Sequence, residues 1–283
     1  MAGARARHDG GAHGLCAGLF PCAPGPRACA VPAEAAVIRL AHVIPVARAA
    51  LLDLVRRRDV AVAGIFTAAL LALLAGARAV GLENPATGTL LLNLGLTLAV
   101  GAAHLMTLLL GARQFPEELE NRTLYPLLAR PVRRAEVLAG KWIACVLAGT
   151  GLYAVLTLAV LALAPRLEFY DHRTGFQMVA LQIPALMTVA AWAMLLSLLL
   201  PKGPAVLIAG VMTFASGALL RLAAAFWLVR LLPDVSKLDL ALRYTDGIGP
   251  LPVSDVILLA GGAAIWILLG LAAAAQLFAG KRL

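Results

Sequence analysis

The sequence predicts an all-α, polytopic integral membrane protein with six transmembrane helices and both termini in the cytoplasm. Of its 283 residues, 61% are hydrophobic and 14% are charged, and the mean hydropathy is +0.89. Soluble proteins average about 25% charged residues, so this chain has too few charges to cover a soluble surface. Its apolar residues also form long runs, and a helix needs about 20 such residues to cross a bilayer.

Six apolar runs account for the predicted spans. The fifth is short, and Arg221 follows it. A charge at the bilayer centre costs about 2.5–3.5 kcal/mol on insertion scales, so we expect Arg221 near the end of a span and residues 221–253 in an outer loop or a re-entrant segment. The predicted spans are Val60 to Ala77, Leu90 to Gly111, Trp142 to Ala164, Phe176 to Leu200, Pro204 to Leu220 and Val256 to Phe278.

The distribution of basic residues predicts the orientation. Of the 24 lysines and arginines, fourteen lie on the side of the N-terminus, seven lie on the opposite side, and three lie in the extreme N-terminus. Basic residues accumulate in loops that stay in the cytoplasm, which predicts a multi-pass protein of the plasma (inner) membrane with both termini inside. The same rule accounts for the net charge of +9, so we expect lipid and not nucleic acid as its surroundings.

The N-terminal part of the chain divides into two segments. Residues 1–36 are rich in Ala, Gly and Pro and have no sustained apolar run, which predicts a disordered extension or a start codon assigned too far upstream. Residues 37–58 place apolar side chains at helical spacing from Val43 to Leu54, with Arg48 and Asp53 on the other face. This pattern predicts an amphipathic helix at the inner membrane interface, serving as an anchor or as a contact for a partner.

A charged block between the second and third predicted spans, EELENRTLYPLLARPVRRAEVLAGK at 117–141, is compatible with three chemistries. Gly140-Lys141 ends like a phosphate-binding loop, but Trp142 stands where the loop needs a hydroxyl. Glu117-Glu118 with Arg122 matches the EExxxR element of CAAX-type intramembrane proteases, a chemistry that also needs histidines on neighbouring spans. The third possibility is a docking element, a short helix ended before Pro131 and followed by a new helix from Arg133.

The same block resembles the cytoplasmic loop of ABC transporter permeases of the type-2 exporter class (the ABC-2 family), which runs roughly E-x4-T-L-x2-L-L-x2-P-V-x-R-x5-G-K. The resemblance covers about residues 37–283 and includes an outer stretch at 231–240. It implies that residues 112–141 form a coupling loop that docks into a groove of a cytoplasmic ABC ATPase subunit. The expected docking residues are Glu118, Arg122, Thr123, Leu124, Leu127, Leu128, Pro131, Arg134, Gly140 and Lys141.

The resemblance also implies the partners and the chemistry. The chain would form the translocation path of an exporter together with a second permease copy or paralogue. It would bind no cofactor itself, ATP and magnesium would sit on the partner ATPase, and it would have no catalytic residue and no metal site of its own. Polar residues within the spans could line the path or hydrogen-bond a neighbouring helix; these are Asn93, His104, Gln182, Thr213 and Ser216.

Two alternatives remain open from the sequence. One is a protease-like membrane enzyme that uses the EExxxR element at 117–122. The other is a non-transporting membrane regulator that contacts the same kind of ATPase. Neither the cargo nor the identity of the ATPase follows from the sequence.

Overall fold

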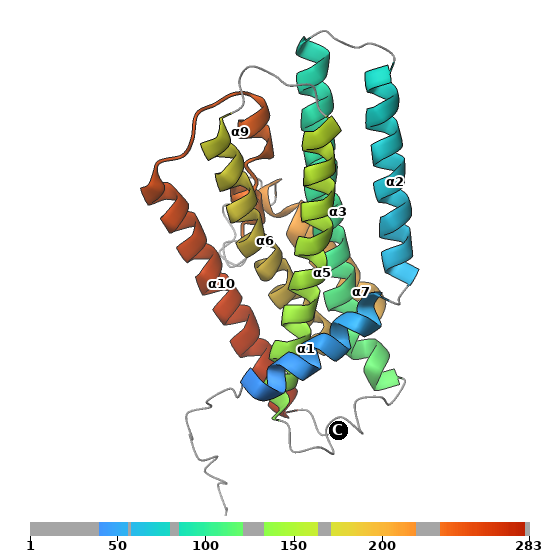
Figure 1. Cartoon of the computed structure of the whole chain (residues 1–283). Helices are drawn as coiled ribbons and strands as arrows, with labels where there is room; N and C mark the ends of the chain where they lie inside the picture. The colour runs from blue at the N-terminus through green and yellow to red at the C-terminus, as the bar shows by residue number, and fades with distance from the viewer. Residues whose placement is uncertain are drawn as a thin grey trace, which may run out of the picture. The chain divides into compact units, whose positions relative to one another are not determined.

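Long apolar helices make up most of the chain that the computed structural model describes, which is residues 40–55, 58–79, 85–120, 133–163, 171–218 and 233–280. The predicted extension at 1–36 lies outside these ranges. The helices are α1 (Leu40–Val55), α2 (Arg58–Ala79), α3 (Pro85–Glu120), α5 (Arg134–Leu163), α6 (His172–Leu199), α7 (Lys202–Phe214), the short η2 (Val235–Leu238) and α9 (Ala241–Thr245), and α10 (Val253–Gly280). Figure 1 shows them as a bundle with α1 lying across one end.

Four of the described helices are long and apolar enough to cross a membrane. Their qualifying segments are Gly88–Glu118, Arg134–Ala162, His172–Leu199 and Val253–Gly280. They correspond to the second, third, fourth and sixth predicted spans, so the prediction of an all-helical membrane protein is confirmed for this part of the chain. The complete set of six spans stays a prediction.

The first and fifth predicted spans give shorter apolar helices. The apolar segment of α2 runs Gly64–Gly76, and α7 has 13 residues. At 1.5 Å per residue α7 rises about 20 Å, less than the about 30 Å of a hydrocarbon core. The backbone leaves helical geometry at Ala215, with φ −104° and ψ 0°. The helix predicted from Pro204 to Leu220 is therefore interrupted after Phe214.

The core of the bundle forms where α3 packs against α5 and α6, and α6 packs against α10. Close approach of α3 and α5 needs a residue without a side chain, because a Cβ on Gly149 would lie 1.9 Å from Oγ1 of Thr107. The η2 and α9 segment also contributes to the core, since Val235 and Leu238 are buried in the same apolar cluster as Leu181 of α6. Part of the predicted outer segment 221–253 thus packs into the bundle.

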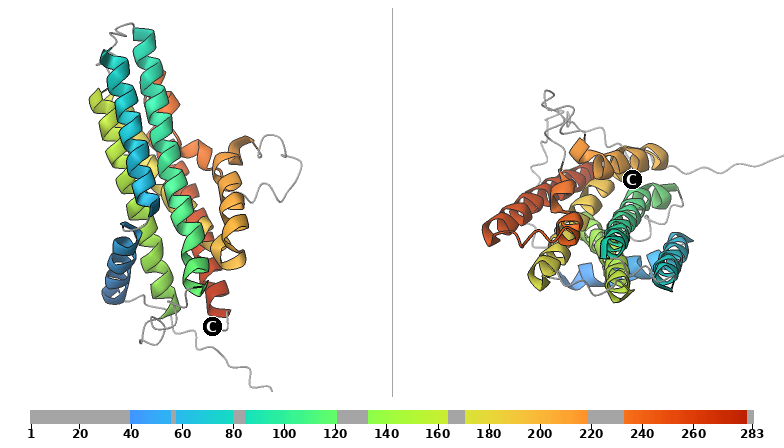
Figure 2. Two further views of the ribbon diagram at one scale, coloured as in Figure 1. Left: turned by 90° about the vertical axis from the view of Figure 1, so that its right-hand side faces the viewer. Right: turned by 90° about the horizontal axis from the view of Figure 1, so that it is seen from above.

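The face of α1 that the sequence predicts to be apolar is the face that is covered. Val43, Ala47 and Leu54 are buried, whereas Arg48 and Asp53 are exposed. This face packs on α5, and the two further views in Figure 2 show α1 against the lower part of α5. The structure thus gives a helix over Leu40–Val55 with α5 as a neighbour of its apolar face, and its place at the membrane interface stays a prediction.

Contacts between helix ends show which segments share one side of the bundle. Arg134 at the start of α5 reaches the end of α10, and Lys202 at the start of α7 forms an ion pair with Glu120 at the end of α3. At the opposite end, Gln177 of α6 exchanges two 2.9 Å hydrogen bonds with the backbone of Leu251, just before α10. These contacts group the helix ends at two ends of the bundle, while the alternation of the loops and the side that faces the cytoplasm stay predictions.

Candidate functional site

Three helix ends contact one another next to the predicted coupling segment: the last turns of α3, the first turns of α5 and the last turns of α10. We call this region the loop end. Residues 112–120 are helical and continue α3, and α5 begins at Arg134, next to the start predicted from the sequence. Residues 121–132 lie outside the described ranges. The helix start at α5 is capped locally, because Arg133 N donates a 3.2 Å hydrogen bond to Oε2 of Glu136.

An ion pair joins α3 and α5 at the loop end. The ammonium of Lys141 donates to the Glu118 carboxylate. The Lys141 side chain is only 4% exposed and the Glu118 side chain 23% exposed, so the pair is shielded from solvent on one side. A buried ammonium is costly unless it is paired, which makes this contact a structural tie between the two helices that flank the predicted loop.

Aromatic rings extend this tie to α10. The Lys141 ammonium lies 4.6 Å from the centre of the Phe115 ring, and the Phe115 and Phe278 ring centres are 5.2 Å apart at an interplanar angle of 55°. The Arg134 guanidinium lies 5.9 Å from the Phe278 ring centre. Arg134 Nη1 also donates to the carbonyl oxygens of Phe278 and Ala279 at 2.9 and 3.0 Å, which satisfies carbonyl groups at the C-terminal end of α10.

Gly140 brings α1 against the loop end. A Cβ at this position would lie 2.7 Å from Cγ1 of Val46 and 3.2 Å from the backbone nitrogen of Ala47. Contacts this short do not occur between real side chains, so only glycine allows α1 to approach α5 this closely. The Gly-Lys pair at 140–141 is thus a packing point followed by an ion-pairing residue, within a continuous helix.

Four of the ten predicted docking residues fall in the described ranges, and the structure brings them together at the loop end. Glu118 pairs with Lys141, Arg134 binds the end of α10, and Gly140 contacts α1. Whether any of them contacts an ATPase stays a prediction. The other predicted docking residues, Arg122, Thr123, Leu124, Leu127, Leu128 and Pro131, lie outside the described residues.

The predicted path residues separate into one interhelical pair and three isolated groups. His104 of α3 and Gln182 of α6 are both buried, and the Nε2 atoms of the two side chains are 3.2 Å apart. The hydroxyl of Thr213 donates to the Ala209 carbonyl one turn earlier in α7. The remaining two are Asn93, which accepts a 3.4 Å hydrogen bond from Thr97, and Ser216, whose buried hydroxyl has no hydrogen-bond partner among the described residues.

The protease-like alternative requires the acidic residues and a histidine in one site. His104 and Glu118 lie on the same helix, 14 residues apart, which corresponds to about 21 Å along the axis. His104 contacts Gln182, and Glu118 contacts Lys141. The two groups that a metal- or base-assisted cleavage would use are therefore held in separate places.

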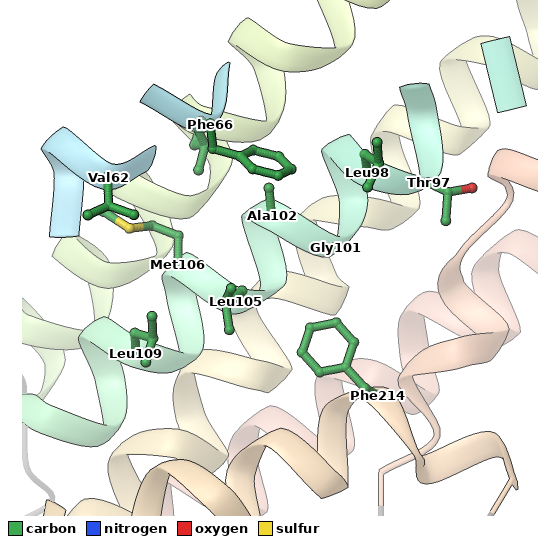
Figure 3. Close-up of a pocket in the computed structure, with 11 residues that line it drawn as sticks. Val62, Phe66, Thr97, Leu98, Gly101, Ala102, Leu105, Met106, Leu109 and Phe214 are labelled. Atoms are coloured by element: carbon green, nitrogen blue, oxygen red, sulfur yellow. The ribbon is translucent and has the colours of Figure 1, made fainter. Parts of the chain in front are cut away.

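A cavity of about 370 Å³ opens between α2, α3 and α7. Figure 3 shows Phe66 of α2 on one side and Phe214 of α7 on the other, with Leu105 and Gly101 of α3 between them. Thr97 lies at one end, and none of the described residues that line the cavity carries a charge. The lining is therefore mostly apolar, and Phe214 also makes an edge contact with the His104 ring, with ring centres 6.4 Å apart.

Sequence reasoning missed both the cavity and the aromatic contacts of the loop end. None of the five predicted path residues lines the cavity. Its α3 wall follows the helical spacing Leu98, Gly101, Leu105 and Leu109, and the two small residues Gly101-Ala102 were a usable signal for a hollow on that face. Phe115 and Phe278 are 163 positions apart, so no local pattern relates them.

Comparison with known proteins agrees with this architecture. The sequence model of a family described as ABC-2 family transporter protein matches residues 33–234. This match covers more than half of the chain, and the chain therefore belongs to the ABC-2 transporter membrane proteins. No curated relative matches the sequence.

Proposed function

We propose that the chain is the permease subunit of an ATP-driven exporter, coupled to a separate cytoplasmic ABC ATPase through residues 112–141. Membership of the ABC-2 family supports a role as the membrane component of a transporter, and subunits of this family are typically non-catalytic. The observation that carries the coupling assignment is the loop end, where both flanks of segment 121–132 are fixed to the bundle by the Glu118–Lys141 pair and by Arg134.

Transmission of force explains why fixed flanks matter. A loop attached to flexible helix ends would absorb a displacement, whereas helices packed into a core shift as units. The ATPase, carrying ATP and magnesium, closes and displaces segment 121–132. The displacement passes into α3 and α5, and the bundle alternates between inward-open and outward-open states, with a second permease copy completing the path.

The cavity between α2, α3 and α7 is the proposed apolar part of the cargo path. Its aromatic and aliphatic lining suits an apolar or amphipathic cargo, since burial of apolar surface drives such binding. A Cβ on Gly101 would have no heavy atom within 4 Å. Gly101→Leu should therefore fill the cavity without displacing the backbone and should lower the ATP-dependent efflux of apolar fluorescent dyes from dye-loaded intact cells.

A matched variant controls for the added volume. Gly151 of α5 has equal room for a side chain and does not line the cavity, so Gly151→Leu should leave efflux unchanged. Equal efflux by the Gly101→Leu variant and the parent would remove the cavity from the cargo path.

The coupling assignment is tested by photo-crosslinking. A benzophenone amino acid at Leu124 or Leu127, within the expected docking segment, should capture an ATPase that carries a phosphate-binding loop. The same amino acid at Ile248, an exposed residue near the opposite end of the bundle, should not. Capture from Ile248 alone would reverse the orientation, and no ATPase capture from either segment would refute the coupling role. A non-transporting regulator would give the same capture as an exporter but no ATP-dependent efflux.

A further inference from the structure

A continuous stack of four side chains crosses the loop end: Lys141, Phe115, Phe278 and Arg134. The four side chains come from three helices: Lys141 and Arg134 lie on α5, Phe115 on α3 and Phe278 on α10. Both rings are fully buried, and both belong to one apolar cluster with Leu138 of α5. The stack therefore connects three helices through three buried side chains, Lys141, Phe115 and Phe278, and the partly exposed Arg134.

The position of α10 makes this connection important. Among the four long helices, α10 is the least covered by the rest of the chain. Its buried residues Ala263, Ile267, Gly270 and Ala274 follow one face along α6. At its C-terminal end, Phe278 adds a contact with the two helices that flank the predicted coupling segment.

Three interactions hold Phe278 in place. Its ring contacts the Arg134 guanidinium and the Phe115 ring, and its carbonyl oxygen accepts a hydrogen bond from Arg134. The electron-rich face of an aromatic ring attracts a cation, which an aliphatic side chain of similar size cannot do. The aromatic character of residue 278 is thus separable from its volume.

We propose that Phe278 is a positioning residue for energy coupling, which ties α10 to the loop end so that the ends of α3, α5 and α10 move as one body. This inference rests on the proposed function, since it assumes that an ATPase displaces segment 121–132. Through Phe278, that displacement reaches α10 directly, in addition to the two helices that the segment joins.

Three variants separate the ring from the volume it occupies. Phe278→Leu keeps an apolar side chain in the cluster and removes the ring, whereas Phe278→Tyr keeps the ring. Leu277→Ala alters the adjacent residue, which is partly exposed and lies outside the stack. If Phe278 had a merely structural role, its variants would change assembly and thermal stability only. The decisive readout is therefore the movement of α10.

The experiment measures the distance between spin labels at Arg133→Cys and Gly280→Cys by electron paramagnetic resonance. Both positions are exposed, and a Cβ on Gly280 meets no heavy atom within 4 Å. The four native cysteines are replaced by alanine, and the chain is reconstituted with its ATPase, either nucleotide-free or trapped with ATP and vanadate. For the parent chain, Phe278→Tyr and Leu277→Ala, the distance distribution between the two labels should be the same in the nucleotide-free and the trapped state.

With Phe278→Leu, the distribution should broaden or shift upon ATP trapping, and the ATPase rate stimulated by the permease should fall several-fold while ATPase recovery in pull-downs is unchanged. An ATP-dependent distance change in the parent chain would refute the inference and leave the proposed function intact. Identical distance distributions for Phe278→Leu and the parent chain would do the same. Failure of the parent chain to recover any ATPase would instead refute the proposed function, and the inference with it.

Discussion

The ion pair between Glu118 and Lys141 gives a stability prediction that also decides the role of Glu118. Glu118→Ala leaves a nearly buried ammonium without that carboxylate. Removing one partner of a fully buried pair costs about 3–5 kcal/mol. Because the Glu118 side chain is 23% exposed and Lys141 also faces the Phe115 ring, we expect a smaller loss of about 2–3 kcal/mol in the free energy of unfolding.

The converse variant should cost less. Lys141→Met removes the charge and keeps the unbranched apolar stem, so the partly exposed Glu118 carboxylate becomes solvated. We expect a loss of roughly 1 kcal/mol, and the double variant Glu118→Ala/Lys141→Met should be close to Lys141→Met alone, because the buried charge is then absent. For a chain of this size, 2–3 kcal/mol corresponds to roughly 4–10 °C in Tm.

The assay is thermal unfolding of the purified chain in nanodiscs, combined with ATPase recovery in pull-downs. The structure predicts the order Glu118→Ala least stable, then Lys141→Met, then the parent. An unchanged Tm for Glu118→Ala would refute the structural reasoning. If ATPase recovery fell at the same time, Glu118 would be the docking residue that the sequence predicts.

Three further predictions concern packing, pH and topology. Gly140→Ala should lower the free energy of unfolding by about 1–3 kcal/mol, because its Cβ would overlap Val46 and force α1 from α5. Gly151→Ala should not, since the space around Gly151 is open. Equal Tm values for the two variants would contradict the close contact of α1 and α5. The backbone N–H of Arg173 and the Thr174 hydroxyl lower the pKa of Asp171 below its ordinary value of 3.8, so its N-cap contribution is present above pH 3.8 and is lost as pH falls through the lowered pKa. The Tm difference between the parent and Asp171→Ala should therefore shrink below pH 3.8, and a difference independent of pH would contradict the carboxylate's role. In intact cells, an impermeant thiol reagent should label Asp246→Cys and not Glu120→Cys, and the opposite pattern would reverse the predicted orientation.

The helices were the most predictable part of the fold. Runs of apolar residues identified all four of the long helices, because a span must be apolar over its whole length. The covered face of α1 was also predictable, since Val43, Ala47 and Leu54 recur at helical spacing and this alone defines one face. The start of α5 followed from Pro131 and the residues after it.

The tertiary contacts were not predictable in the same way. The sequence predicts Glu118 as a docking residue for an ATPase, and the structure pairs it with Lys141, 23 residues later on the next helix. Helical spacing specifies neighbours on one helix only, whereas this contact depends on how α3 and α5 are packed. The end of α7 at Phe214 was not predictable for a related reason. The sequence stays apolar through Ala215, whereas the backbone leaves helical geometry there.

Capture of the partner at the coupling segment tests the central claim most directly. The photoreactive amino acid at Leu127 is activated in membranes of cells that produce the chain at its native level, and the crosslinked protein is sequenced and assayed. We expect capture of one ABC ATPase that carries a phosphate-binding loop and hydrolyses ATP. Capture should fall when detergent dissociates the ATPase from the chain before irradiation. Capture of no ATPase at Leu127, together with ATP hydrolysis by the purified chain alone, would refute the role of the chain as a permease coupled to a separate ATPase.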